Sequence, residues 1–392
     1  MMHSIVKSLC NFHRLSKPTG RYIYKQIQRP YSSEALVQQL FEGLCAKDRT
    51  SLARAITLVE TSNAKKRKLA QNLVSMVSAD LQKEQDRNKG IPSSFRIGLS
   101  GPPGAGKSTF IETLGKQLTG AGHRVAVLAV DPSSNTTGGS LLGDKTRMPR
   151  LTVDPAAYIR PSPTGGHLGG VTRVTNDTIL LCERAAYDVI IVETVGVGQS
   201  EISVSEMVDV FLLLMPPAGG DELQGLKRGI VELADVIAIN KSDGDLVPAA
   251  RRIQAEYLSA LKFVRPRLAG WRVPVLRCSA RTGDGMTELW QTLTAFRERM
   301  TADGQLAARR RRQRAVWLWS QIERAVVDAF RRHPAVRSRL PRLEREVATG
   351  RLPPGVAADR LVQLFLEGSG RGGERRAEER SRTGHSEEGT PR

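Results

Sequence analysis

One short segment of the chain carries residue types and a spacing that suit phosphate chemistry. It reads Gly101-Pro102-Pro103-Gly104-Ala105-Gly106-Lys107-Ser108 and is followed by Thr109. Glycines at this spacing allow backbone N–H groups to turn toward phosphates, and a lysine adds a positive charge for the β- and γ-oxygens. We therefore expect residues 101–109 to bind a nucleotide, and we predict that Lys107 is also catalytic.

Magnesium is the expected companion of a bound nucleotide, and it prefers oxygen ligands. The Ser108 hydroxyl is one candidate, because the serine of this motif suits the ion. Three carboxylates are the others: Glu193 and Asp131 each end an apolar run, and Asp144 lies in a polar loop. Each of the three could instead be an ordinary acid at a strand end or a turn. The predicted metal ligands are Ser108, Asp131, Asp144 and Glu193.

A second motif, Asn240-Lys241-Ser242-Asp243, concerns the base of the nucleotide. Guanine presents a ring N–H and an exocyclic amine side by side, and one carboxylate such as Asp243 can accept from both. Adenine lacks that amine, so the motif favours GTP over ATP. Ser279-Ala280-Arg281 follows an apolar run at 274–278 and could offer a backbone N–H to the guanine oxygen. The predicted base-binding residues are Asn240, Lys241, Asp243, Ser279, Ala280 and Arg281.

The elements that must position these motifs alternate in type along the chain. Short apolar, β-rich runs alternate with helical patterns, and the runs occupy 95–100, 124–131, 188–193, 208–215, 236–240 and 274–278. This alternation is typical of βαβ units. We predict an α/β fold, a P-loop GTPase domain with a mostly parallel, doubly wound sheet, in which ligands bind at the carboxyl ends of the strands.

Helical patterns flank this region on both sides. Apolar residues recur at helical spacing before residue 92, and after residue 300 one face of a long helix is marked by Val316, Trp319, Ile322, Val326 and Phe330. The last stretch has no large apolar residue, which is typical of a disordered tail. The predicted organisation is a transit peptide at 1–31, a helical extension at 32–92, the GTPase domain at 93–300, a helical region at 301–366 and the tail at 367–392.

The net charge of +19 would by itself suggest nucleic acid or an anionic membrane as a partner. Much of the excess lies outside the central region, however: residues 1–33 hold six Lys or Arg and no acid. Such a segment, rich in serine and without a long apolar run, is typical of a mitochondrial transit peptide, although a plain basic terminus is the alternative. We expect location in the mitochondrial matrix, with neither nucleic acid nor a membrane as partner.

The four cysteines form no CxxC pair, so no zinc ribbon or disulfide framework is expected.

Several longer motifs resemble one family, the GTPase chaperones of methylmalonyl-CoA mutase. They lie at 131–134, 138–148, 160–163, 193–201 and 216–225, within a resemblance that covers about residues 34–366. The resemblance implies a GTPase that docks on the cobalamin-dependent mutase. It further implies that nucleotide state gates the loading of adenosylcobalamin from the cobalamin adenosyltransferase and helps to remove inactivated cofactor.

The same resemblance implies roles for four further parts of the chain. The predicted metal ligands would surround Mg²⁺, and residues 131–148 and 193–201 would move with nucleotide state. Residues 216–227 resemble a third switch that passes this state to the mutase. If the family resemblance is set aside, the same residues indicate only a glycine-rich connection between a strand and a helix. The C-terminal helices resemble a dimerisation arm, which implies a homodimer. A simpler interpretation is that the face of residues 316–330 packs on the GTPase domain, and the two interpretations are compatible.

Hydrolysis of GTP needs positioning and charge stabilisation more than covalent chemistry. Gln199 is the candidate for orienting the attacking water, although it lies three positions after Gly196 rather than directly after it. We expect slow intrinsic hydrolysis that the partner accelerates.

Three other classes of protein share parts of this pattern. A GTP-dependent metallochaperone for another metal cofactor would carry Cys or His ligands near the moving loops, whereas the six histidines here are scattered. A kinase of a transport system would prefer adenine, and Asp243 argues against it. A GTPase module that binds RNA would be favoured by the net charge, and its binding would weaken as salt rises.

His167 and the long tail depart from the family pattern, and neither is assigned a role.

Overall fold

The computed structural model describes residues 33–61, 63–131, 148–163, 168–194, 200–217, 228–264, 267–268 and 270–367. Asp144 and Gln199 lie outside these residues, as do the predicted transit peptide and the predicted tail from residue 368 onward. The backbone of Asp131 is described, but its side chain is not.

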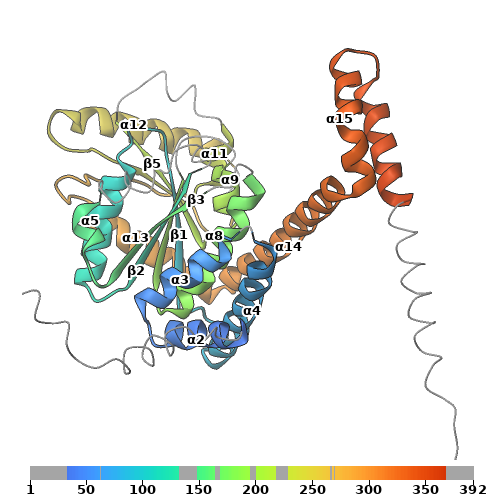
Figure 1. Ribbon diagram of the computed structural model, residues 1–392. Coiled ribbons are helices and arrows are strands. Elements are labelled where there is room, and N and C mark those ends of the chain that lie inside the picture. Colours follow the sequence, from blue (N-terminus) through green and yellow to red (C-terminus); the bar gives the residue numbers. More distant parts are fainter. Residues whose placement is uncertain are drawn as a thin grey trace, which may run out of the picture.

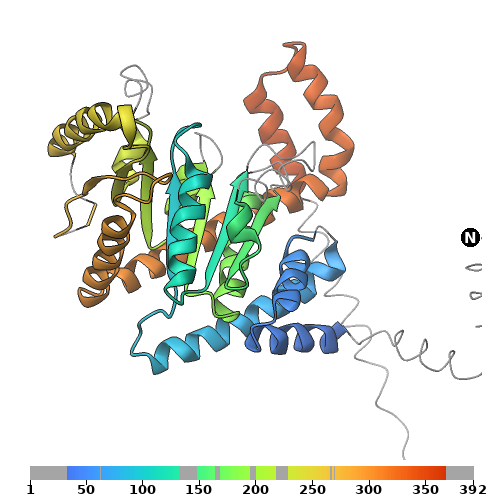
Figure 2. The same ribbon diagram turned by 90° about the vertical axis from the view of Figure 1, so that its left-hand side faces the viewer.

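Seven parallel strands form one sheet, in the order β3-β2-β4-β1-β5-β6-β7 (Figures 1 and 2). Their bounds are β1 Phe95–Ser100, β2 Val125–Asp131, β3 Ala157–Pro163, β4 Val189–Thr194, β5 Val210–Met215, β6 Val236–Ile239 and β7 Val275–Arg277. β1 pairs with β4 on one side and with β5 on the other, and all three strands are buried throughout. A parallel sheet of this kind is covered on both faces. The predicted α/β class with a parallel, doubly wound sheet is confirmed.

One strand, β3, was not predicted from the sequence patterns. It reads Ala-Tyr-Ile-Arg-Pro-Ser-Pro and so lacks a continuous apolar run. It pairs with β2 from Val125↔Ala157 to Asp131↔Pro163. Two prolines are tolerated because β3 is an edge strand, and one side of an edge strand needs no ladder donors. The six predicted runs all correspond to strands; the bounds of the first coincide with those of β1, and those of the others differ by at most two residues.

Helices cover both faces of the sheet (Figures 1 and 2). One face is covered by α5 Lys107–Gly120, α7 Pro149–Thr152 and α13 Met286–Ala302. The other is covered by α8 Leu168–Arg184, α9 Ser200–Ser205, α11 Arg228–Leu233 and α12 Val247–Ala260. Side chains alternate between the faces along each strand. Ile97 and Leu99 therefore lie in the first core, while Ile190 and Val192 lie in the second.

Three helices precede the sheet and form an outer layer against α8. They are α2 Ser33–Cys45, α3 Arg49–Val59 and α4 Ala64–Arg87. Asp48 caps α3 by accepting backbone N–H bonds from Thr50 and Ser51 at 3.2 and 2.7 Å. Leu52 and Leu73 are fully buried in the core that α8 also joins. Each such side chain contributes roughly 1.5–3 kcal/mol, so this layer is held by apolar burial.

The C-terminal helices form an arm that extends away from the sheet (Figures 1 and 2). α14, Gln305–Arg332, begins against the domain, and α15, Pro334–Ala348, and a helix at 354–367 fold back beside its far end. The arm has a small core of its own, formed by Val336, Leu343, Leu352, Ala357 and Leu361. In the part of the chain that the structure describes, no helix is long and apolar enough to cross a membrane.

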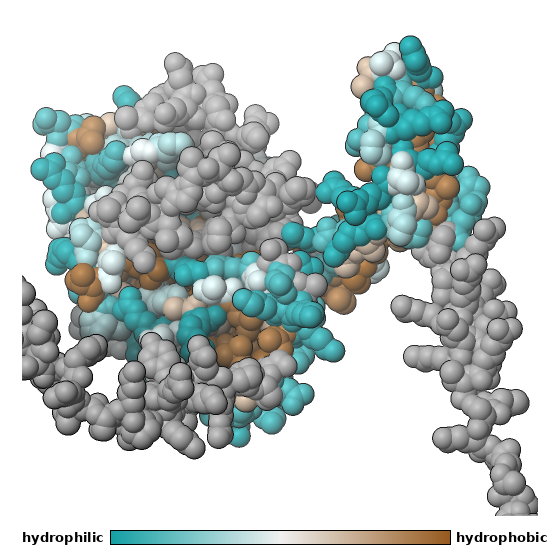
Figure 3. All heavy atoms as spheres, in the orientation of Figure 1, coloured by the Kyte–Doolittle hydropathy of each residue, from teal (hydrophilic) through white to brown (hydrophobic). Residues whose placement is uncertain are grey.

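The apolar face predicted on the long helix does not pack on the GTPase domain. Val316, Trp319, Ile322 and Val326 are 38%, 64%, 40% and 52% exposed, and Figure 3 shows apolar surface where α14 leaves the domain. Phe330 packs inside the arm instead. Trp317 is the residue that faces the domain, and its Nε1–H donates to the Glu206 carbonyl oxygen at 2.9 Å. The alternative in which residues 316–330 pack on the domain is therefore wrong.

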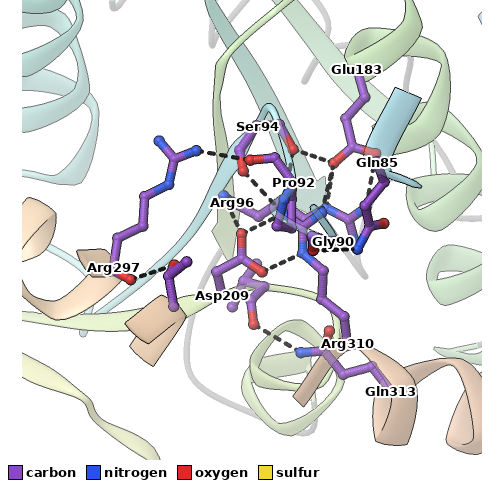
Figure 4. A network of polar contacts seen from close by, with 12 residues as sticks. Gln85, Gly90, Pro92, Ser94, Arg96, Glu183, Asp209, Arg297, Arg310 and Gln313 are labelled. Atoms are coloured by element: carbon purple, nitrogen blue, oxygen red, sulfur yellow. Dashed lines mark hydrogen bonds and ion pairs between the residues drawn. The ribbon is translucent and has the colours of Figure 1, made fainter. Parts of the chain in front are cut away.

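Buried charges tie the start of α14 to the amino ends of the strands (Figure 4). Arg310 donates to the two carboxylate oxygens of Asp209 at 2.7 and 2.6 Å, and Asp209 also accepts the Arg96 backbone N–H at 2.9 Å. The Arg96 side chain donates to the two oxygens of Glu183 at 2.7 and 2.8 Å. Burial raises the pKa of Asp209 and of Glu183, but the arginines outweigh it and hold both pKa values below their ordinary range. The arm is therefore anchored by ion pairs rather than by apolar packing alone.

Candidate functional site

Residues 101–106 form a loop between β1 and α5, at the carboxyl edge of the sheet. Gly101 lies so close to β5 that a Cβ atom would come within 2.1 Å of the Leu214 carbonyl oxygen. Gly106 has a φ of +89°, and a Cβ atom there would lie 2.7 Å from the Asn240 amide nitrogen. Glycine is therefore required at both positions. The loop leads directly into the first turn of α5, whose N–H groups have no partner within the helix and can bind anionic oxygens.

The predicted phosphate ligands stand at the start of α5. Lys107 is its first residue, and its Nζ donates to the Gly101 carbonyl oxygen at 2.8 Å and to that of Pro102 at 3.4 Å. The ammonium group therefore lies over the loop. Ser108 follows and is half-buried, whereas Thr109 is exposed. A phosphate in the loop would replace the two weaker carbonyl contacts of Lys107 by charge-assisted ones.

Asn240 joins the three loops that hold the predicted binding residues. Its Nδ2 donates to the Ala105 carbonyl oxygen at 2.9 Å, and its Oδ1 accepts the backbone N–H of Ala280 at 3.0 Å. The residue is 1% exposed, and a buried amide is stabilising when both ends are paired in this way. The carboxyl ends of β1, β6 and β7 are thereby held together around one side chain.

Asp243 faces the loop that follows β7. Its Oδ1 accepts a hydrogen bond from Ser279 Oγ at 2.6 Å, and Ser279 is fully buried. The hydroxyl orients the carboxylate and leaves its other lone pairs available for a base. Lys241, which adopts a φ of +58°, and Arg281 are exposed beside this pair. The structure thus brings Asn240, Asp243, Ser279 and Ala280 into one hydrogen-bonded group.

The described metal-ligand candidates lie at the same edge of the sheet. Ser108 is in the first turn of α5, and Glu193, which is 4% exposed, is aligned with Leu99 of β1. Asp131 ends β2, the neighbour of β4 on its other side. The hydroxyl of Ser108 and the carboxylate of Glu193 are the kinds of ligand that Mg²⁺ prefers, so the donor chemistry fits that ion. The placement of Asp144 and Gln199 lies outside the described residues.

Three polar side chains of this region were not predicted from the sequence. Thr194 Oγ1 donates to Ser100 Oγ at 2.9 Å, and both residues are fully buried, so this bond joins β4 to β1. Thr113 Oγ1 donates to the Ala280 carbonyl oxygen at 2.6 Å and joins α5 to the loop after β7. Partners in these pairs are 94 and 167 residues apart, and no local pattern signals such contacts.

The site defines a class of protein. A glycine loop joins a buried strand to a helix, a lysine lies over that loop, and an oriented carboxylate stands at the end of a nearby strand, as in P-loop GTPases. No group of three or more His, Cys, Asp or Glu side chains that could hold a metal ion lies within the described ranges. The magnesium candidates above are not such a group, because they include the Ser108 hydroxyl and Asp131, whose side chain is not described. The fold and the site are those of a P-loop GTPase.

Comparison with known proteins identifies the family. The family model described as methylmalonyl-CoA mutase-associated GTPase MeaB matches residues 52–335. The chain therefore belongs to the family of methylmalonyl-CoA mutase-associated GTPases, and it is a GTPase. The family that the sequence motifs predicted is confirmed.

Individual relatives agree with this assignment. The methylmalonic aciduria type A homolog, mitochondrial, of Mus musculus is 59% identical over 333 residues, covering 85% of this chain and 80% of that protein. A putative GTPase of Caulobacter vibrioides is 50% identical over 329 residues, which are 84% of this chain and 98% of that protein. The crystal structure of an LAO/AO transport system kinase has a TM-score of 0.65 and 34% identity, covering 85% of this chain and 98% of that one.

Proposed function

We propose that this GTPase is a chaperone of methylmalonyl-CoA mutase. Its nucleotide state would gate the loading of adenosylcobalamin from the cobalamin adenosyltransferase and the removal of inactivated cofactor. The family description, which names association with the mutase, supports the partner. The name of the mouse relative, which is a mitochondrial protein, supports location in the mitochondrial matrix after removal of residues 1–31.

The observation that carries the nucleotide assignment is the pairing of three loops through Asn240, with Asp243 oriented by Ser279. Asp243 would accept the ring N–H and the exocyclic amine of guanine. The backbone N–H groups of residues 101–109 would hold the phosphates, and Lys107 would neutralise charge on the β- and γ-oxygens. Gln199 would orient the attacking water.

The metal site would be formed by Ser108, Asp131, Asp144 and Glu193. Their oxygens suit Mg²⁺, which supplies positive charge beside the transferred phosphoryl group. Arg281 and Lys241 would line the base pocket from its exposed side.

A homodimer is the assembly that the arm supports. Four apolar side chains of α14, Val316, Trp319, Ile322 and Val326, are at least 38% exposed in the single chain. Contiguous exposed apolar surface of this kind marks interaction sites. In our proposal a second copy of the chain covers this face.

The proposed function is tested by GTP hydrolysis with and without the mutase. The chain from residue 32 onward should hydrolyse GTP slowly and select it over ATP, because adenine lacks the adjacent ring N–H and amine that guanine offers to Asp243. Adding methylmalonyl-CoA mutase should raise kcat. A GTP-selective rate that the mutase leaves unchanged would remove the mutase from the proposal and leave the nucleotide chemistry in place.

Asp243→Asn should lower the affinity for GTP by about 10- to 100-fold, because a hydrogen bond to a charged group is worth roughly 1.5–3 kcal/mol. The amide offers a donor where guanine also has a donor. Xanthosine triphosphate, which has a carbonyl oxygen at that position, should gain affinity relative to GTP. Fluorescent nucleotide displacement measures both constants.

Asp245→Asn, two positions along and exposed, is the matched control and should bind GTP like the unmodified chain. Unchanged GTP affinity in Asp243→Asn would refute the assignment of the base.

A further inference from the structure

A hollow of about 720 Å³ lies at the amino-terminal ends of β6 and β7. It is lined by the end of α11, the end of α12, the turn η3 at Leu261–Phe263 and, between η3 and β7, by residues 264, 267–268 and 271–273. Asp235 lines it directly before β6, whereas Asn240 follows β6 at its other end. The hollow is therefore on the opposite edge of the sheet from the proposed nucleotide site. No residue that lines the hollow belongs to that site. Its volume is in the range of pockets that hold small molecules, about 300–1,000 Å³.

The walls of the hollow are apolar because the two cores of the protein meet there. Val231 and Leu261 pack at the edge of one core, and Leu268 and Trp271 pack at the edge of the other. All four side chains are half-buried, so each still presents apolar surface to the hollow. Leu258, which lines the same space, is 45% exposed. Uncovered apolar surface in a concave place favours an apolar ligand.

Trp271 gives the hollow a fixed wall. Its Nε1–H donates to the Asp235 carbonyl oxygen at 2.8 Å. Its ring meets the ring of Phe296 edge to face, with centroids 4.9 Å apart. A side chain held by a hydrogen bond and an aromatic contact loses little freedom when a ligand packs against it.

Positive charge surrounds the apolar walls. Lys262, Arg267 and Arg272 line the hollow, and in the described part of the chain no carboxylate lies within ion-pair distance of them. Two acids also line the hollow: Glu232, which is exposed, and Asp235, which already accepts from Arg309 at 2.9 Å and from the Phe211 N–H at 2.8 Å. Three cations therefore face one carboxylate that is not already paired with a buried arginine.

Arg267 is held in the lining by a hydrogen bond to the backbone. Its Nη1 donates to the Leu233 carbonyl oxygen at 2.8 Å. Burial lowers the pKa of Arg267, and the neighbouring Arg309 and Arg312 lower it further, against the opposing effects of Asp235 and Glu206. An anion beside Arg267 would relieve this repulsion.

We propose that this hollow is a binding site for a small amphipathic acid, a molecule with an apolar body and one carboxylate or phosphate head. The body would pack against Leu261, Leu268 and Trp271. The head would lie among Lys262, Arg267 and Arg272, where a guanidinium can donate to two oxygens at once. The site is independent of the proposed mutase function, since it uses none of the residues assigned to the nucleotide.

Binding is tested with 11-(dansylamino)undecanoate, whose fluorescence rises when it leaves water. The probe should bind the chain and be displaced by decanoate or by decyl phosphate, and the more effective of the two identifies the preferred head. Decanol, which has the same body without charge, should displace it about tenfold less well or worse. Equal displacement by decanol, or no saturable binding of the probe, would overturn the proposal.

Variants locate the binding on the molecule. The double change Arg267→Ala and Arg272→Ala should weaken probe binding by about tenfold or more, and so should Leu258→Glu, which places a carboxylate at a half-exposed wall position. The matched control is Arg251→Ala with Arg252→Ala, two exposed arginines of α12 that do not line the hollow. Thermal unfolding and GTP binding of each variant report on folding and on the nucleotide site. If both lining variants bind the probe as the control does, the proposal is wrong.

Discussion

Replacing Lys107 by alanine should lower kcat for GTP hydrolysis by about 10²- to 10³-fold, the loss found when one positioned donor to a developing charge is removed. Lys107 starts α5, and its ammonium group already lies over the loop, 2.8 Å from the Gly101 carbonyl oxygen. A phosphate held by that loop would therefore meet the positive charge without rearrangement of the backbone. Single-turnover hydrolysis at saturating GTP separates this catalytic loss from a loss of affinity.

The control for Lys107→Ala is Lys83→Ala, which removes an exposed lysine of α4 on the outer helical layer. It should hydrolyse GTP at the unmodified rate. Lys107→Arg is informative as well, because a planar guanidinium does not reproduce the compact ammonium group and should not restore the rate. If Lys107→Ala hydrolysed GTP as fast as Lys83→Ala, the phosphate site would have been assigned to the wrong residues.

Asp209→Asn should lower the free energy of unfolding by about 3–5 kcal/mol, the cost of breaking a buried ion pair by removing one of its partners. Asp209 is 0% exposed and accepts from Arg310 through both oxygens and from the Arg96 backbone N–H. With an amide in its place, the buried Arg310 guanidinium keeps only Glu183, whose Oε1 lies 3.5 Å from its Nη1 and which also pairs with Arg96. Urea denaturation followed by circular dichroism measures the change.

The matched control is Asp328→Asn, in the far half of α14, where the partner Arg332 lies 3.6 Å away and 68% exposed. An exposed pair of this kind contributes at most about 0.5 kcal/mol. The double variant Asp209→Leu with Arg310→Met removes both buried charges and should recover part of the loss. Equal stabilities of Asp209→Asn and Asp328→Asn would show that the arm is not anchored by this pair.

The arginine run at the start of α14 shows what composition leaves open. Arg309, Arg310, Arg311 and Arg312 are adjacent, and their charge adds to the excess of the C-terminal part of the chain. In the structure Arg309 and Arg310 are 6% and 7% exposed, while their two neighbours face solvent. The difference arises because Asp235 and Asp209 lie on one side of the helix only. Helical geometry selects which arginines can be buried, but only packing supplies the carboxylates.

Strand β3 is a second case in which packing outweighs local pattern. Its two prolines and its arginine give no strand signal, and its sequence reads as a loop. The strand forms because β2 offers an unpaired edge along its whole length, from Val125 to Asp131. Intrinsic strand preference is weak compared with such pairing.

The sequence by itself determined the parallel α/β class and the family, and it predicts phosphate binding at residues 101–109 and guanine binding at Asn240 to Asp243. These properties depend on residues that are neighbours in the chain, where glycine conformations, hydrogen-bonding groups and apolar periodicity can be read directly. Only the tertiary structure decided that Asn240 ties together three loops, that Ser279 orients Asp243, that α14 is anchored by Arg310, and that the hollow beside Trp271 exists. Each of these depends on groups that are distant in the chain, and their meeting is set by how two cores pack on one sheet.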